Sequence, residues 1–483
     1  MLTLVNRGAC GWGVTLRQGL RWNRRLPRSI SGRGILGAVI LQSVFPMSER
    51  RKNILIRTVA ALYLAVLAIM TCFMFEWMFK LPTVQYHDFA KYYTAAKMLA
   101  SSQGDKIYDL EYSNKIWREV SHEGESERPI TMEFSPTYPL LLFSFGKLNI
   151  SDAYPIWQAL WISCGCIGLF SLLRSIHGAS GMWVNFFRTF ILFVATMASL
   201  PEARGMVLGQ PCWLILGFTS GFCSAFVAKR DIAAGIMLAI STVKFQYSPF
   251  LAVAALAGKR WKLLAFAAVG FLLLSLGSMS LIGVDAFIHA PFAILKWDSM
   301  KELEVDINPQ SMVNFRGVLS IFFGAESAMK CSIFIMIAGL MLTLKIWLDA
   351  VKIGTRAVPW ALSFTVAAFL LFSAHVHMYE CVVLSICPAL TFPTFDPVRL
   401  LAVRMWSMRL WICLLVSYPL LIWVVFFLDV KVLHFNPIGT NLSVLTVLAL
   451  NLVNVALLVL AAVNLYKTRE ACESKPLLAN QEV

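Results

Sequence analysis

Asp88 is the residue whose type and position most clearly suggest chemistry. It lies in HDFAKYYTAAKML, residues 87–99, just beyond the first long apolar segment of the chain. A carboxylate held where a hydrophobic segment meets water can act as a general base for a sugar hydroxyl. A structural role is an equally good interpretation, because Asp is a favoured helix N-cap. Position 91 is Lys rather than Glu or Gln, so no reciprocal capping box supports that role.

Other polar residues recur at one end of the predicted membrane segments, which suggests that they share one level of the membrane. The candidate substrate-binding residues are His87, Tyr92, Glu202, Gln210, Gln246, Asn308, Gln310, His375 and His377, and the candidate donor-phosphate ligands are Arg204, Lys244 and Arg316. Ionisable groups in or beside membrane spans are costly and usually face a cavity. Cationic side chains there can hold the phosphate of a lipid carrier and stabilise it as a leaving group.

Each of these residues also has a purely structural interpretation. Lys244 can snorkel to the headgroups, Arg204 can pair with Glu202, and a lone histidine is more often structural than catalytic. The sequence contains no GxxxxGKS, HExxH or GxSxG motif, so a soluble nucleotide donor is unsupported. The 11 cysteines show no zinc spacing, and no cofactor is implied, although a divalent cation stays open.

The elements that position these residues are predicted to be membrane helices. Of the 483 residues, 58% are hydrophobic and 14% charged, which is too little polar surface for a soluble fold of this size. In lipid, backbone groups must be hydrogen-bonded within helices or within a closed β-barrel, and the sequence lacks the alternating pattern of a barrel. We therefore expect an all-α bundle of about twelve spans, at 57–75, 154–173, 183–200, 212–228, 231–244, 247–258, 262–282, 331–348, 358–374, 379–394, 410–428 and 443–465.

The net charge of +15 is spread over short basic runs at every second connection, which marks those connections as cytoplasmic rather than as a nucleic-acid surface. The outward loops are then 80–153 and 284–330. In the first loop, residues 89–100 are predicted to form an amphipathic helix on the membrane surface, and residues 134–148 a half-helix that does not cross. The membrane domain is predicted over 49–466, with a cytoplasmic tail at 467–483. Residues 1–48 hold seven arginines and no acidic residue, so they are either a misplaced start or a leader.

The order of the motifs resembles that of glycosyltransferase family 87 of the GT-C superfamily, from about residue 57 to about residue 430. The motifs that carry the resemblance are DFAKYYTAAKML, SPTYPLLLFSFGKL, LGQPCWLILG, VKFQYSPFLAVAAL, NPQSMVNFRGVLS and SAHVHMYECVVL. The resemblance implies a polytopic enzyme that moves a sugar, commonly mannose, from a polyprenyl-phosphate carrier to a glycan or glycolipid acceptor outside the cytoplasm. It also implies that Asp88 is the general base.

Relatives in this family often carry a second acidic residue beside this Asp, where the present chain has His87. The favoured setting is a bacterial plasma membrane, with cell-envelope glycans as acceptors, and the endoplasmic reticulum is the alternative. A lipid-linked-sugar flippase or secondary transporter is the main rival function, although the halves 57–260 and 262–465 show no internal repeat. A noncatalytic scaffold is a third interpretation.

Overall fold

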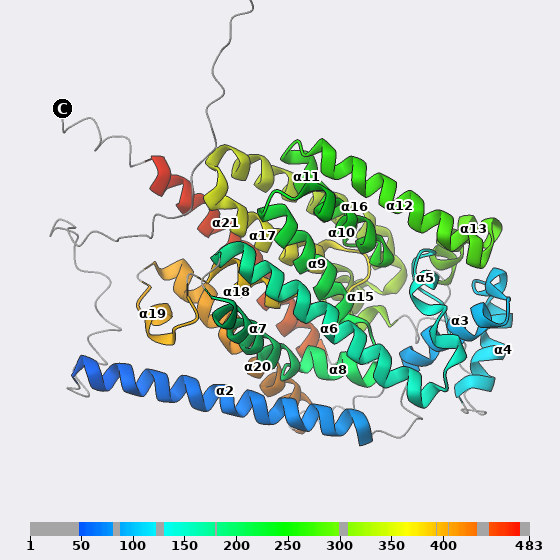
Figure 1. Cartoon of the computed structure of the whole chain (residues 1–483), viewed down its shortest axis with the longest axis horizontal. Coiled ribbons are helices and arrows are strands. Elements are labelled where there is room, and N and C mark those ends of the chain that lie inside the picture. The colour runs from blue at the N-terminus through cyan, green and yellow to red at the C-terminus, as the bar shows by residue number, and fades with distance from the viewer. Residues whose placement is uncertain are drawn as a thin grey trace, which may run out of the picture. The chain divides into compact units, whose positions relative to one another are not determined.

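The chain folds into a bundle of α-helices (Figure 1). The computed structural model describes residues 48–80, 87–121, 130–178, 181–298, 308–392, 394–403, 405–431 and 444–473. Within these ranges there is no β-strand, and a single isolated bridge joins Met312 to His377. The predicted extension at 1–48 therefore lies almost wholly outside the described residues, as does the tail beyond Glu473.

The α-helices have the following bounds: α2 Glu49–Lys80, α3 His87–Ala100, α4 Leu110–Ser121, α5 Pro139–Leu142, α6 Ile150–His177, α7 Met182–Met197, α8 Leu200–Leu208, α9 Cys212–Val227, α10 Asp231–Ser241, α11 Ser248–Ala257, α12 Trp261–Ile282, α13 Val284–Asp298, α15 Phe315–Phe323, α16 Ala325–Ile353, α17 Val358–Phe372, α18 Ile386–Thr391, α19 Pro397–Leu401, α20 Trp406–Lys431 and α21 Val444–Glu473. Short 3-10 segments connect them at η2 Gly104–Lys106, η3 Phe145–Lys147, η4 Thr242–Lys244, η6 Pro309–Ser311, η7 Thr355–Ala357 and η8 Met378–Ser385.

Seven helical segments in the described part are long and apolar enough to cross a membrane. They are Glu49–Glu76, Ile150–His177, Trp261–Ile282, Ala325–Ile353, Thr355–Phe372, Trp406–Leu428 and Val444–Ala471. The pair Met182–Met197 and Leu200–Leu208 passes the same test together, but it bends by 72° at the break. The prediction of an all-α membrane protein is thus confirmed.

The predicted count of twelve spans is not confirmed. Each predicted segment does fall on helical structure, but Cys212–Val227, Ser248–Ala257 and Met378–Thr391 are short apolar helices of fewer than 18 residues. A 16-residue helix such as α9 is only about 24 Å long, whereas the hydrocarbon core is about 30 Å thick. Apolar composition therefore identified the helices without deciding which of them cross.

Small residues allow the central helices α6 and α9 to pack closely. A Cβ added to Gly165 would lie 2.3 Å from the Trp213 ring, and one added to Gly168 would lie 2.4 Å from the Ser220 hydroxyl. Glycines at such positions let the two helix backbones come close together. Close packing matters in a membrane because lipid provides no hydrophobic driving force for helix association. Helix α9, which begins just after Gln210, is almost wholly buried in this packing.

The first connection after α2 folds back on the protein. Helix α3 forms over the predicted residues, but Phe89, Tyr92, Tyr93 and Ala96 are all buried in the core. Its predicted position on the membrane surface is not confirmed. Residues 134–148 contain only the short helices α5 and η3 and are not among the candidate spans. Figure 1 shows α3, α4 and α5 gathered at one end of the bundle, away from α19.

Candidate active site

Asp88 lies in the first turn of α3 and faces two polar partners. The Gln210 amide Nε2 donates a hydrogen bond to Asp88 Oδ2 at 2.6 Å, and Lys91 Nζ lies 3.9 Å from Oδ1. Helix α3 begins at His87, so Asp88 is inside the helix rather than at its N-cap. The structural interpretation of Asp88 as a cap is therefore not supported. The His87 side chain lies outside the described part.

A glycine brings Gln210 within reach of α3. Gly209 ends α8 in the left-handed conformation, with φ of +71°. Its N–H donates to the Met206 carbonyl, and the N–H of Gln210 donates to the Gly205 carbonyl. A Cβ at position 209 would lie 2.4 Å from the Phe89 Cβ. Glycine is thus required twice, for its dihedral angle and for the close approach of α3. Tyr92 completes the arrangement by donating its hydroxyl hydrogen to Gln210 Oε1 at 2.9 Å.

Lys244 and Glu380 form a second polar pair. Lys244 ends η4, where the chain breaks between α10 and α11, and its Nζ lies 3.0 Å from Glu380 Oε1. The other Glu380 oxygen accepts from the His377 backbone N–H at 3.0 Å. The Glu380 side chain is fully buried, so its pairing with Lys244 offsets a large desolvation cost.

The segment 373–377 is held between two other stretches of chain. The Gln246 Nε2 donates to the His375 carbonyl at 3.1 Å, and the Val313 N–H donates to the Val376 carbonyl at 2.8 Å. Asn314, the N-cap of α15, accepts from the Gly317 N–H and donates to the Ser373 carbonyl. These bonds place Arg316, two residues further on, so that its Nη1 donates to the Ala374 carbonyl at 3.3 Å.

Two histidines and a glutamate lie together beside this segment. The His375 and His377 ring centroids are 4.7 Å apart. His375 Nε2 lies 3.8 Å from Glu133 Oε2, and the Thr131 hydroxyl donates to the other Glu133 oxygen. Burial lowers the pKa of His375 well below its usual value, and the positive charges of Arg316, Lys244 and Lys91 act in the same direction. His375 is accordingly neutral at neutral pH.

One cleft of about 160 Å³ gathers most of the predicted residues. Its lining includes Asp88, Tyr92, Gln210, Lys244, Gln246, Arg316, His375 and His377. Burial raises the pKa of Tyr92 well above its usual value, so this residue serves as a neutral donor. Eight predicted residues from five separate stretches of the sequence thus share one cavity.

The other predicted residues do not line this cleft. Glu202 is 1% exposed on α8 and interacts electrostatically with Cys212 at the start of α9. Arg204 is close enough to Asp88 for an electrostatic interaction but is not part of the lining. Asn308 is buried at the start of η6, and Gln310 is exposed.

The sequence interpretation missed several lining residues. They are Lys91, Thr131, Glu133, Ser135 and Tyr379. Glu133 directly precedes an apolar stretch, whereas Asp88 follows one. This position at the edge of an apolar stretch was the sequence feature that could have identified Glu133. Among the described residues, no group of three or more His, Cys, Asp or Glu side chains is arranged to hold a metal ion.

The profile of glycosyltransferase family 87 matches residues 134–374, about half of the chain. The chain belongs to glycosyltransferase family 87. The resemblance seen in the sequence is thereby confirmed, and with seven candidate spans this family 87 chain is a membrane glycosyltransferase. The matched region contains Gln210, Lys244 and Arg316, whereas Asp88 lies before it. Neither the curated proteins nor the solved structures searched gave a match.

Proposed function

We propose that this enzyme transfers a hexose, with mannose favoured, from a polyprenyl-phosphate donor to a glycan or glycolipid acceptor on the non-cytoplasmic side of the membrane. The observation that carries the proposal is the shared cleft, in which Asp88 lies with Lys244, Arg316 and two histidines. A lipid-linked donor needs no nucleotide site, which agrees with the absence of nucleotide-binding motifs from the sequence.

The charge of the cleft supports a phosphodiester ligand. Its lining holds three cationic side chains, Lys91, Lys244 and Arg316, and two carboxylates, Asp88 and Glu133. Counting these five groups alone, one formal positive charge remains, which complements the single negative charge of a sugar phosphodiester. We assign phosphate binding to Lys244 and Arg316, with Arg204 acting on Asp88 from just outside the lining.

The proposed reaction is a single displacement at the anomeric carbon. Asp88 accepts the proton from the acceptor hydroxyl as the acceptor oxygen forms its bond to C1. The bond between C1 and the phosphate oxygen breaks, and its electron pair leaves with the polyprenyl phosphate, which Lys244 and Arg316 stabilise. One displacement inverts the anomeric configuration. Gln210 and Tyr92 hold the Asp88 carboxylate in place through the bonds at 2.6 and 2.9 Å.

The cleft also offers surfaces for the sugar and the acceptor. Phe134, Tyr92 and Tyr379 supply aromatic faces, while Gln246, His375 and His377 supply polar groups. This combination of an apolar wall with a few oriented polar groups is typical of small-molecule sites. We assign the enzyme to a bacterial plasma membrane and its acceptors to the cell envelope.

Purified protein in liposomes tests the proposal. Radiolabelled polyprenyl-phosphate mannose, polyprenyl-phosphate glucose and GDP-mannose are each supplied with candidate glycolipid acceptors, and labelled products are separated and their anomers identified. We expect transfer from a lipid-linked donor, with inversion, and none from GDP-mannose alone. Transfer from the nucleotide sugar would contradict the proposal. Movement of the intact lipid-linked sugar across the bilayer without transfer would favour the rival flippase.

A further inference from the structure

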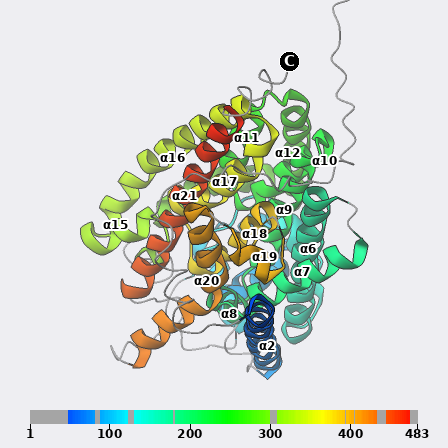
Figure 2. The same cartoon turned by 90° about the vertical axis from the view of Figure 1, so that its left-hand side faces the viewer.

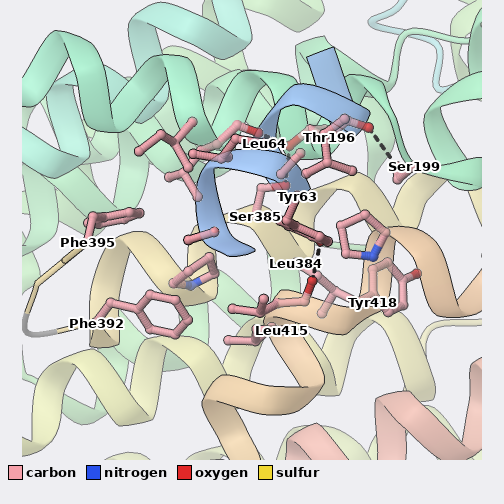
Figure 3. Close-up of a pocket in the computed structure, with 18 of the residues that line it drawn as sticks. Tyr63, Leu64, Thr196, Ser199, Leu384, Ser385, Phe392, Phe395, Leu415 and Tyr418 are labelled. Carbon is pink, nitrogen blue, oxygen red and sulfur yellow. Dashed lines mark hydrogen bonds between the residues drawn. The ribbon is translucent and has the colours of Figure 1, made fainter. Parts of the chain in front are cut away.

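A second cavity, which shares no lining residue with the candidate active site, lies between α2 and the rest of the bundle (Figure 3). It has a volume of about 180 Å³, and its walls come from α2, α7, the η8–α18 segment and α20. Leu64 and Leu67 of α2 face Leu384 and Leu415 across it. Figure 2, which looks along α2, shows α7 and α20 on either side of this helix.

The walls of this second cavity, called the groove from here on, consist mainly of apolar side chains. Its polar side chains are largely engaged within the protein, since the Tyr63 hydroxyl donates to the Val416 carbonyl and Thr196 bonds to Ser385 at 2.5 Å. Ser199 donates to the Thr196 carbonyl at 2.6 Å, as Figure 3 shows. A ligand in the groove therefore meets few polar groups, and an acyl chain is the chemistry that fits.

One end of the groove opens at a cluster of charges. A neighbouring cavity of about 440 Å³ shares Ala60, Leu64 and Ile191 with the groove and adds Arg57, Arg188 and Asp396. Asp396 Oδ2 lies 3.9 Å from Arg57 Nη2 and 3.8 Å from Arg399 Nε. Arg57 and Arg399 thus flank this carboxylate, and Arg188 lines the same cavity, so basic side chains outnumber acidic ones at this end of the groove. The Arg57 side chain is 68% exposed, so it is accessible to a ligand.

We propose that this groove binds an anionic phospholipid, with its phosphate at Arg57 and Arg188 and one acyl chain along α2. The length supports a lipid of one leaflet, because Leu67 lies ten residues after Arg57, which corresponds to about 15 Å of helix, half of a hydrocarbon core of about 30 Å. The basic runs of the sequence predict the cytoplasmic side for Arg188 and for residues 50–52, which lie just before Arg57, and anionic lipids concentrate on that side. Because the backbone of α2 approaches its neighbours at few points, the lipid fills the space between α2 and the bundle.

Photolabelling in nanodiscs tests this proposal. Full-length protein is placed in nanodiscs of phosphatidylcholine that contain a phosphatidylglycerol probe with a diazirine on one acyl chain, and labelled peptides are mapped by mass spectrometry. We expect labels on the segments around Leu64, Ala195 and Leu384, competed by unlabelled phosphatidylglycerol but not by added phosphatidylcholine.

Two variants with matched controls complete the test. Each basic residue near an anionic membrane surface contributes about 1 kcal/mol, so Arg57→Gln with Arg188→Gln should weaken groove labelling roughly 10- to 30-fold. Arg356→Gln, which changes an exposed arginine elsewhere, should leave it unchanged. Ala195→Phe should block the groove, whereas Ala265→Phe on the exposed face of α12 should not.

The proposal is overturned if labelling of the groove is insensitive to both sets of changes, or if the label falls elsewhere. It is also overturned if a polyprenyl-phosphate probe with a terminal diazirine displaces phosphatidylglycerol from the groove, because the cavity would then hold the end of the donor chain. Neither readout depends on transferase activity.

Discussion

Replacing Asp88 by Asn removes the proposed base with little change in shape. The new side-chain amide can still accept the 2.6 Å hydrogen bond from Gln210 through its oxygen, so the local fold is retained. The substitution also removes the interaction with Lys91, which lies 3.9 Å away and is 16% exposed. Because both side chains are largely buried, the free energy of unfolding should fall by about 3 kcal/mol at most.

Catalysis should be affected separately from stability. A positioned general base accelerates a reaction by about 10²- to 10⁴-fold, so Asp88→Asn should lower kcat by that factor, or about 3 to 5 kcal/mol of barrier. The KM for the lipid donor should change little, because Lys244 and Arg316 hold the phosphate. The assay is transfer from radiolabelled polyprenyl-phosphate sugar in liposomes, with thermal unfolding in detergent measured in parallel.

Asp109 supplies the matched control for this variant. It lies in the same loop region and accepts a hydrogen bond from the Tyr112 N–H at 3.0 Å, as a true N-cap of α4. Asp109→Asn should preserve activity within a factor of about two and cost roughly 1 kcal/mol of stability at most. If Asp88→Asn retains activity within about tenfold of the wild type while remaining folded, Asp88 is not the base, and the proposed mechanism is wrong.

Three further predictions follow from the same contacts. Lys244→Gln leaves the fully buried Glu380 without its cationic partner and should reduce the free energy of unfolding by about 3 kcal/mol, while the double variant with Glu380→Gln should recover most of it; equal unfolding of single and double variants would contradict this. Gln210→Leu removes the donor to Asp88 and the acceptor for Tyr92 and should lower kcat roughly tenfold, whereas Gln158→Leu, at a buried glutamine on α6, should not change it, as liposome transfer assays can check. Because the folded-state pKa of His375 is lowered below 6.5, the unfolded state binds more protons as the pH falls below that value, and stability falls with it. His375→Gln should therefore lose roughly 1 kcal/mol less stability than wild type between about pH 7.5 and 5.5, as measured by denaturant unfolding; a larger loss in the variant would mean that Glu133, 3.8 Å away, dominates instead.

The sequence by itself determined the helices and the family. Lipid offers no hydrogen bonds to the backbone, so each apolar run must be helical whatever its neighbours are, and all twelve predicted segments fall on helical structure. The same local reasoning singled out Asp88, Gln210, Lys244 and Arg316, because polar residues are costly at the ends of apolar segments and stand out there. The ordered motifs around them were enough to indicate family 87.

Only the tertiary structure decided which of these residues meet. The direction of a side chain depends on the rotation of its helix and on the bends between helices, and neither follows from composition. The chain bends by 72° after α7, and Gln210 then lines the cleft whereas Glu202, eight positions earlier, is buried and does not line it. Glu133 and Glu380 acquired their significance from partners more than 100 residues away, His375 and Lys244, which no local pattern reveals.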